Sequence, residues 1–147
     1  MPSRAIALVL MVGVCGGAAY AQGRGAAGNA PVQQAPTDRT VPISKEQLAQ
    51  YLKEMDARKI ATLRLIEGGK FNANIRRITA PERPLIHPNT IDFWVVIEGS
   101  GAVTTGGRVE NDRIVGGETH PVKVGDIEFI PANLPHAMSQ INGSSIT

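Results

Sequence analysis

The chain has 147 residues, which is enough for one domain preceded by a leader. Its hydrophobic fraction of 42% is ordinary for a globular protein, while 16 glycines and 10 prolines indicate a fold with many turns. The formal net charge is only +2, and no basic run is interleaved with aromatic residues, so the composition argues against a nucleic-acid partner.

The first 21 residues have the pattern of a secretory signal peptide. Arg4 supplies a positive charge, an apolar run covers residues 5–14, and Ala19-Tyr20-Ala21 gives a small-x-small cleavage pattern. The apolar run is shorter than the roughly 20 residues that a membrane-spanning helix needs. We therefore expect cleavage after Ala21 and a secreted or periplasmic protein without a membrane partner. A retained membrane anchor is the alternative.

A composition rich in glycine, alanine, proline and amide side chains marks residues 22–42, which we expect to form a flexible linker. The folded domain is then expected over residues 43–147. Helix signals begin at Ser44, which can cap a helix, with Gln47 as its reciprocal partner in a capping box. A helix is predicted over residues 44–58, lying across one end of a sheet. Its apolar face consists of Leu48, Leu52 and Met55.

From residue 60 onward the hydrophobic pattern changes to a period of two residues, which is typical of β-strands. A hairpin turn is expected at residues 67–70, and a polar loop is expected over residues 106–118 with a solvated tip at Glu110-Asn111-Asp112. Short strands at regular spacing with glycine and proline turns favour an all-β sandwich or barrel. The predicted strands cover residues 60–66, 71–79, 91–98, 102–105, 119–124, 126–130 and 137–141.

The most informative segment runs from Gly125 to His136 and reads GDIEFIPANLPH. A glycine turn opens a short apolar strand, Pro131 ends it, and a rigid loop delivers one histidine to a fixed point. This spacing resembles the second motif of the cupin family, in which a glycine stands where this chain has Asn133. The exchange is mild, because asparagine is among the few side chains that tolerate a left-handed backbone.

The resemblance covers roughly residue 63 to the C-terminus and implies the fold class. That fold is all-β, a double-stranded β-helix in which two antiparallel sheets roll into a jelly-roll barrel, here with one N-terminal helix. It also implies a homodimer formed through the outer strands. Such barrels usually end in a further strand, for which little length remains after the Asn142-Gly143 turn. A truncated C-terminus is one explanation.

The first cupin motif, which supplies two histidines and a glutamate, would lie before Gly99. Counting back from this glycine places Asp92 at the glutamate position, His87 at the second histidine and Leu85 at the first. Alternation along the strand puts Asp92 on the same face as Trp94. A carboxylate on a buried face is costly unless it is paired or bound to a metal.

The resemblance therefore implies a divalent metal ion held by His87, Asp92 and His136. Two imidazoles and one carboxylate suit iron, manganese, nickel or zinc and leave positions open for water or substrate. The alternative is a metal-free barrel in which His87 hydrogen-bonds near the rim, Asp92 caps the turn at residues 88–90, and His136 packs below the preceding proline. His120, before Pro121, is expected at the surface of an edge strand.

Two functions remain open from the sequence. The first is a metal-dependent oxygenase or isomerase that acts on a small organic acid or sugar-like molecule through the three ligands. The second is a metal-free, non-catalytic module that binds or senses a small ligand. No catalytic residue separate from the ligand set can be assigned.

Overall fold

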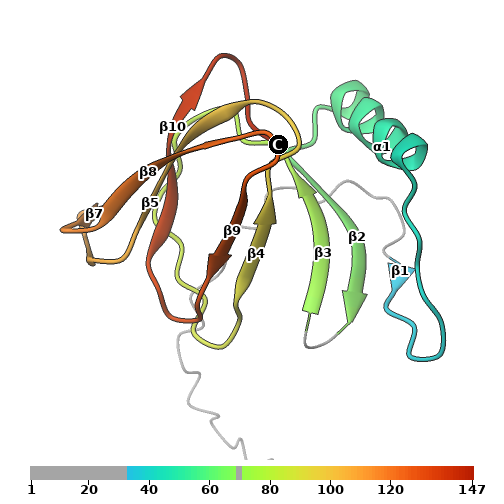
Figure 1. The fold of residues 1–147 in the computed structure, drawn as a ribbon, viewed down its shortest axis with the longest axis horizontal. Helices are drawn as coiled ribbons and strands as arrows, with labels where there is room; N and C mark the ends of the chain where they lie inside the picture. The colour runs from blue at the N-terminus through green and yellow to red at the C-terminus, as the bar shows by residue number, and fades with distance from the viewer. Residues whose placement is uncertain (1–32, 69–70) are drawn as a thin grey trace, which may run out of the picture.

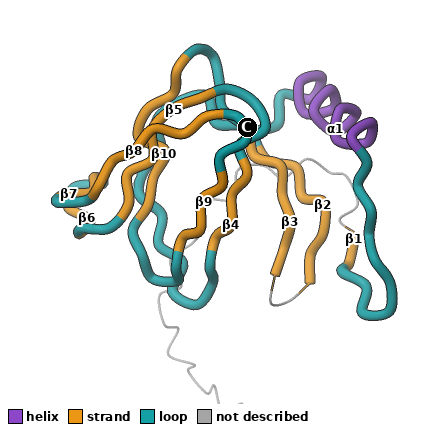
Figure 2. The backbone as a smooth tube through the Cα atoms, viewed as in Figure 1, coloured by secondary structure: helices purple, strands orange, loops and turns teal. Residues whose placement is uncertain are grey.

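The computed structural model describes residues 33–68 and 71–147. The predicted signal peptide, residues 1–21, and the first part of the predicted linker lie outside the described residues. In this part of the chain the structure has one helix and ten strands. Helix α1 lies beside the N-terminal strands β1 to β3, and the remaining strands form a β-barrel next to them (Figure 1 and Figure 2). No helix within these ranges is long and apolar enough to cross a membrane.

Helix α1 (Lys45–Arg58) confirms the prediction of a capped helix. The Ser44 hydroxyl accepts a hydrogen bond from the backbone N–H of Gln47, and the Gln47 side chain accepts one from the Ser44 N–H. The helix ends at Lys59, which takes a left-handed conformation with φ 53°. Its buried side chain is Met55, which packs with residues of the neighbouring sheet.

The N-terminal sheet has the order β1-β2-β3, with strands β1 (Gln33–Gln34), β2 (Thr62–Gly68) and β3 (Phe71–Arg76). Leu63 and Ile75 face the helix and form a small core with Met55. β1 pairs in parallel with β2, and the N–H of Ala35 donates to the carbonyl of Glu67 at 2.8 Å. These residues belong to the segment predicted as a linker, and here they pair with the sheet. Pairing along a strand edge uses backbone groups, so the side chains of residues 33–34 did not reveal it.

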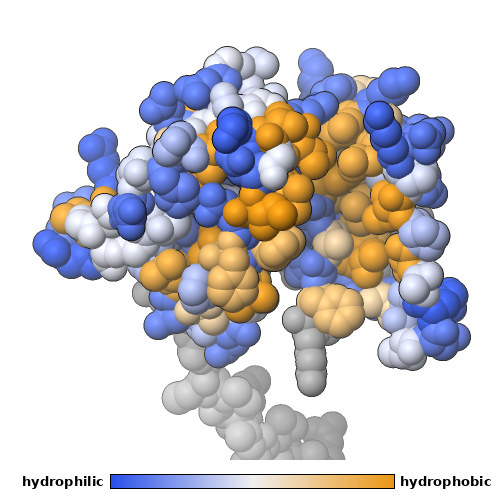
Figure 3. All heavy atoms as spheres, viewed as in Figure 1, coloured by the Kyte–Doolittle hydropathy of each residue, from blue (hydrophilic) through white to orange (hydrophobic). Residues whose placement is uncertain are grey.

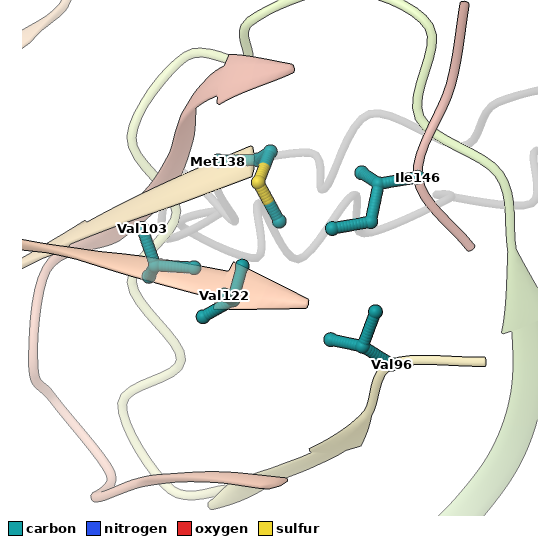
Figure 4. Close-up of a cluster of buried hydrophobic side chains, with 5 residues drawn as sticks. All are labelled: Val96, Val103, Val122, Met138 and Ile146. Atoms are coloured by element: carbon teal, nitrogen blue, oxygen red, sulfur yellow. The ribbon is translucent and has the colours of Figure 1, made fainter. Parts of the chain in front are cut away.

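Two sheets face each other in the barrel. One has the order β10-β5-β8, with strands β5 (Ser100–Thr105), β8 (Glu118–Lys123) and β10 (His136–Asn142). The other pairs β4 (Asp92–Val95) with β9 (Ile127–Ile130). Between them lies an apolar core, drawn in Figure 4, whose buried members are Val96, Val103, Val122, Met138 and Ile146.

The end of the described chain closes the second sheet beside β4. Ile146 pairs with Ile78 across a β-bridge. The N–H of Thr147 donates to the carbonyl of Glu98. The carbonyl of Thr147 accepts hydrogen bonds from the N–H groups of Glu98 and Ile97. The few residues after Asn142-Gly143 thus take up strand-like pairing and contribute Ile146 to the core.

Residues 106–118 do not form the plain loop that was predicted. They contain a hairpin of β6 (Arg108–Glu110) and β7 (Arg113–Val115). Asn111 and Asp112 at its tip have φ values of 49° and 60°, the mirror-image turn that suits the twist of a two-residue hairpin. The tip is exposed, as expected. The polar composition concealed the hairpin, because both strands are largely solvated and show little hydrophobic alternation.

Candidate metal centre

His136 is positioned by the loop that follows β9. Asn133 has φ 65°, so the asparagine adopts the left-handed backbone for which glycine is the commoner choice. Its N–H donates to the carbonyl of His87 at 2.8 Å. The loop that delivers one histidine is therefore fastened to the backbone of the other.

A short antiparallel bridge brings the two histidines together. Leu85 and His136 exchange both backbone hydrogen bonds, at 2.8 and 3.0 Å. Residues directly opposite each other in such a bridge have side chains on the same face, and His87 lies two residues further along on that face. The His87 and His136 rings are 5.3 Å apart between centroids.

Asp92, the first residue of β4, completes the cluster. Its Oδ2 atom lies 3.3 Å from His87 Nε2 and 3.2 Å from His136 Nε2. One ligand atom from each of the three residues falls within 4.8 Å of the others. His136 is 1% exposed, whereas the side chains of His87 and Asp92 are 19% and 22% exposed, so solvent can reach the cluster from one side. The structure thus brings together all three residues that were selected from the sequence.

The hydrogen bonding of His136 leaves one ring nitrogen aimed at this centre. Nδ1 lies 2.9 Å from the carbonyl of Leu134 and must donate to it, because a carbonyl can only accept. In the neutral ring Nε2 then carries the lone pair. This atom is buried and makes no regular hydrogen bond among the described residues, although Asp92 Oδ2 lies 3.2 Å away. A buried polar atom left in this way is costly, and an ion at the centre of the cluster would satisfy it.

The Asp92 carboxylate is suited to a ligand role. Burial by itself raises the pKa of this carboxyl, but the imidazoles of His136 and His87 outweigh it, with a smaller contribution from Trp94. The net pKa lies below its ordinary value, so the group is ionised at neutral pH. The indole N–H of Trp94 donates to Oδ2 at 3.3 Å, and its ring meets His136 edge-on at 5.6 Å. Asp92 thus faces the imidazoles and Trp94 rather than the turn at residues 88–90.

His120 differs from its prediction. β8 is an edge strand, as expected, but the His120 side chain faces Glu128 on β9, with 3.0 Å between Nε2 and Oε1. Glu128 was not selected from the sequence. Alternation could have indicated both residues, because His120 shares a strand face with buried Val122 and Glu128 shares one with buried Ile130.

Residues 79–145 match the family model of the cupin domain. The matched range contains β4 to β10 and all three residues of the cluster. Residues 79–145 thus form a cupin domain, and the facing sheets are those of the jelly-roll β-barrel. Searches of curated proteins and of solved structures found no match.

Proposed function

We propose that the protein is a metal-dependent cupin enzyme, an oxygenase or isomerase of a small organic molecule. His87, Asp92 and His136 would hold one divalent ion. The observation that carries the proposal is the buried Nε2 of His136, which points at the other two ligands without a hydrogen bond of its own. Two imidazoles and one carboxylate match the preferences of iron, manganese, nickel and zinc.

The surrounding residues support a ligand role for each member of the cluster. The Leu134 carbonyl fixes the tautomer and ring orientation of His136. Trp94 orients Asp92 through its indole N–H and places an apolar ring against His136, which limits access of water. A bound ion would act as a Lewis acid or oxygen binder, because three protein ligands leave coordination positions open.

A metal titration tests this proposal. Protein purified without an affinity tag is offered manganese(II) or zinc(II), and bound metal and melting temperature are measured. We expect about one ion per chain, and stabilisation of about 2.7 kcal/mol when free metal is 100-fold above its dissociation constant. Asp92→Asn preserves the side-chain shape but removes the charge, so it should bind metal at least about tenfold more weakly.

Glu110→Gln is the matched control, because it removes a carboxylate from the exposed hairpin of β6 and β7, where its partner is Arg108 rather than a member of the cluster. This variant should bind metal like the wild type. Equal, substoichiometric metal in all three proteins, with no response to a chelator, would rule out the metal site. The metal-free binding module would then be the better function, consistent with the apolar Leu85 at the position of the family's first histidine.

We also propose that the protein is exported and loses residues 1–21. The support is the charged start, apolar run and Ala19-Tyr20-Ala21 pattern of the sequence. Intact mass of the protein recovered from the periplasm or medium should correspond to a chain that begins at Gln22. A full-length protein held in the membrane fraction would contradict this.

A homodimer is the third part of the proposal. The outer face of β4 and β9 exposes Phe93, Val95, Ile127 and Phe129 by 50% to 62%. The register pairs Phe93 with Phe129 and Val95 with Ile127, so the four side chains are neighbours. Figure 3 shows hydrophobic side chains gathered over these two strands. We infer that this face meets the same face of a second copy, since a contiguous exposed apolar patch typically marks an interaction site.

A further inference from the structure

A second polar pair lies inside the barrel, separate from the candidate metal ligands. It consists of His120 on β8 and Glu128 on β9, with 3.0 Å between Nε2 and Oε1. The two strands belong to different sheets, so the pair connects the sheets. The side chains of His120 and Glu128 are 37% and 17% exposed, so solvent reaches the pair.

The strand register shows that His120 faces inward. It is the direct partner of Val103 on β5, which in turn is the partner of Met138 on β10. Partners in an antiparallel ladder share a face. Val103 and Met138 are 0% and 2% exposed and belong to the barrel core. His120 therefore lies on the inner face of its sheet.

The register also places Glu128 beside the candidate metal centre. Its direct partner on β4 is Trp94, whose indole N–H donates to Asp92 and whose ring contacts His136. Asp92 and Trp94 are two residues apart on β4, so one layer of side chains, roughly 7 Å, separates Glu128 from the metal ligands. Trp94 thus contacts two of the metal ligands and lies next to Glu128 in the strand register.

The metal centre and Glu128 would attract different chemical groups of a ligand. A divalent ion held by one carboxylate and two neutral imidazoles retains a net positive charge, which attracts an acid group of a ligand. Glu128 has an imidazole as its described partner, and the two oxygens of a carboxylate can accept further hydrogen bonds. It would bond a hydroxyl group and repel a second carboxylate.

We propose that the His120–Glu128 pair determines the substrate specificity of the barrel. It selects a small hydroxy acid whose end distant from the metal carries a hydroxyl group rather than a second carboxylate. The inference rests on the proposed metal site. The ligand's carboxylate and adjacent hydroxyl bind at the ion, and the distal hydroxyl donates to Glu128. A four-carbon acid is about long enough to span the roughly 7 Å between the metal ligands and Glu128.

Two probes that differ only at the far end test this inference. Both 2,4-dihydroxybutanoate and malate carry a carboxylate and a neighbouring hydroxyl for the ion, but the first ends in a hydroxyl and the second in a carboxylate. Calorimetric titration of zinc-loaded wild type should give at least about tenfold tighter binding of 2,4-dihydroxybutanoate, because malate places two like charges close together. Glu128→Gln should lose this preference while keeping its metal.

Glu110→Gln serves again as the control and should keep the wild-type preference. Metal content is measured in every sample, so the two proposals fail in different ways. Wild type that holds zinc but prefers malate, treats the probes alike or binds neither overturns the inference and leaves the metal site standing. Wild type without zinc overturns both. The wild-type ratio decides the question even if the variant does not fold.

Discussion

Leu85 is the residue where this chain departs most from the motif that it resembles. Its backbone exchanges two hydrogen bonds with His136, so both side chains lie on the face that carries the candidate metal ligands. We expect Leu85→His to supply a fourth ligand and to tighten metal binding by at least about tenfold, because each added ligand contributes to the affinity of a metal site. Competition with a chelator of known affinity measures the change.

A neighbouring residue provides the control for this substitution. Ile86 is 42% exposed, and alternation turns it to the opposite face. Ile86→His adds the same imidazole to the same segment but should leave metal affinity unchanged. Equal tightening by both variants would show that the added histidine acts through nonspecific surface binding rather than at the cluster.

Glu82 should make stability depend on pH. Burial raises the pKa of this carboxyl despite its ion pair with Arg76, and its Oε2 atom is buried without a hydrogen-bond partner among the described residues. A carboxyl whose pKa is higher in the folded than in the unfolded protein favours folding when protonated. That contribution is present below the unfolded value of about 4.5 and is lost as the pH rises through the folded pKa.

Replacing this charge should therefore stabilise the protein at neutral pH. Glu82→Gln can still accept a hydrogen bond from Arg76, and we expect it to raise the free energy of unfolding by on the order of 1 kcal/mol at pH 7. Below pH 4 the difference from wild type should vanish. Urea denaturation at both pH values measures this. A variant that is less stable than wild type at pH 7 would show that the ion pair outweighs the burial.

Arg77 links two parts of the fold that have separate hydrophobic cores. One core joins α1 to β2 and β3, and the other fills the barrel. The guanidinium of Arg77 pairs with Asp56 on the helix, with Glu98 at 2.8 Å, and with the hydroxyl of Thr147 at 3.1 Å. It is only 15% exposed, and it fastens the helical layer to the barrel and to the end of the chain.

Arg77→Lys should loosen this attachment. Lysine cannot form the same fork of hydrogen bonds, so we expect a loss of about 1–3 kcal/mol. Trp94, the only tryptophan, reports on the barrel by fluorescence, while far-ultraviolet circular dichroism also reports on α1. The urea unfolding transitions measured by fluorescence and by circular dichroism should occur at different urea concentrations in Arg77→Lys. They should coincide in Arg76→Lys, which changes the more exposed neighbouring arginine. Coincident transitions in both variants would show that the layers unfold as one unit.

The elements that could be predicted from the sequence carry local signals. The capping box at Ser44 defined the start of α1, and the glycine and proline turns around residues 125–135 defined the loop that positions His136. The pairing of β1 with β2 and the contact between His120 and Glu128 depend on segments that meet only in three dimensions. Periodicity could indicate which face each residue occupies, but not what lies opposite.

In the molecule as a whole, the two faces of β4 and β9 have different roles. Asp92, Trp94 and Glu128 turn inward to the candidate site, while the alternating residues form the exposed apolar patch. Two neighbouring strands therefore serve both the proposed metal site and the proposed dimer. Packing of a second copy against the outer face would hold these strands in place and so support the ligands on the inner face.

The dimer can be tested by making its patch polar. Light scattering coupled to size-exclusion chromatography should give twice the chain mass for wild type. The double variant Phe93→Ser/Phe129→Ser should give the mass of one chain, because it removes the two largest apolar side chains of the patch. Phe71→Ser is the control. It changes an equally exposed phenylalanine that belongs to β3 rather than to the patch, and it should leave the dimer intact. A wild type that stays monomeric at high protein concentration would exclude the outer face as a contact between copies.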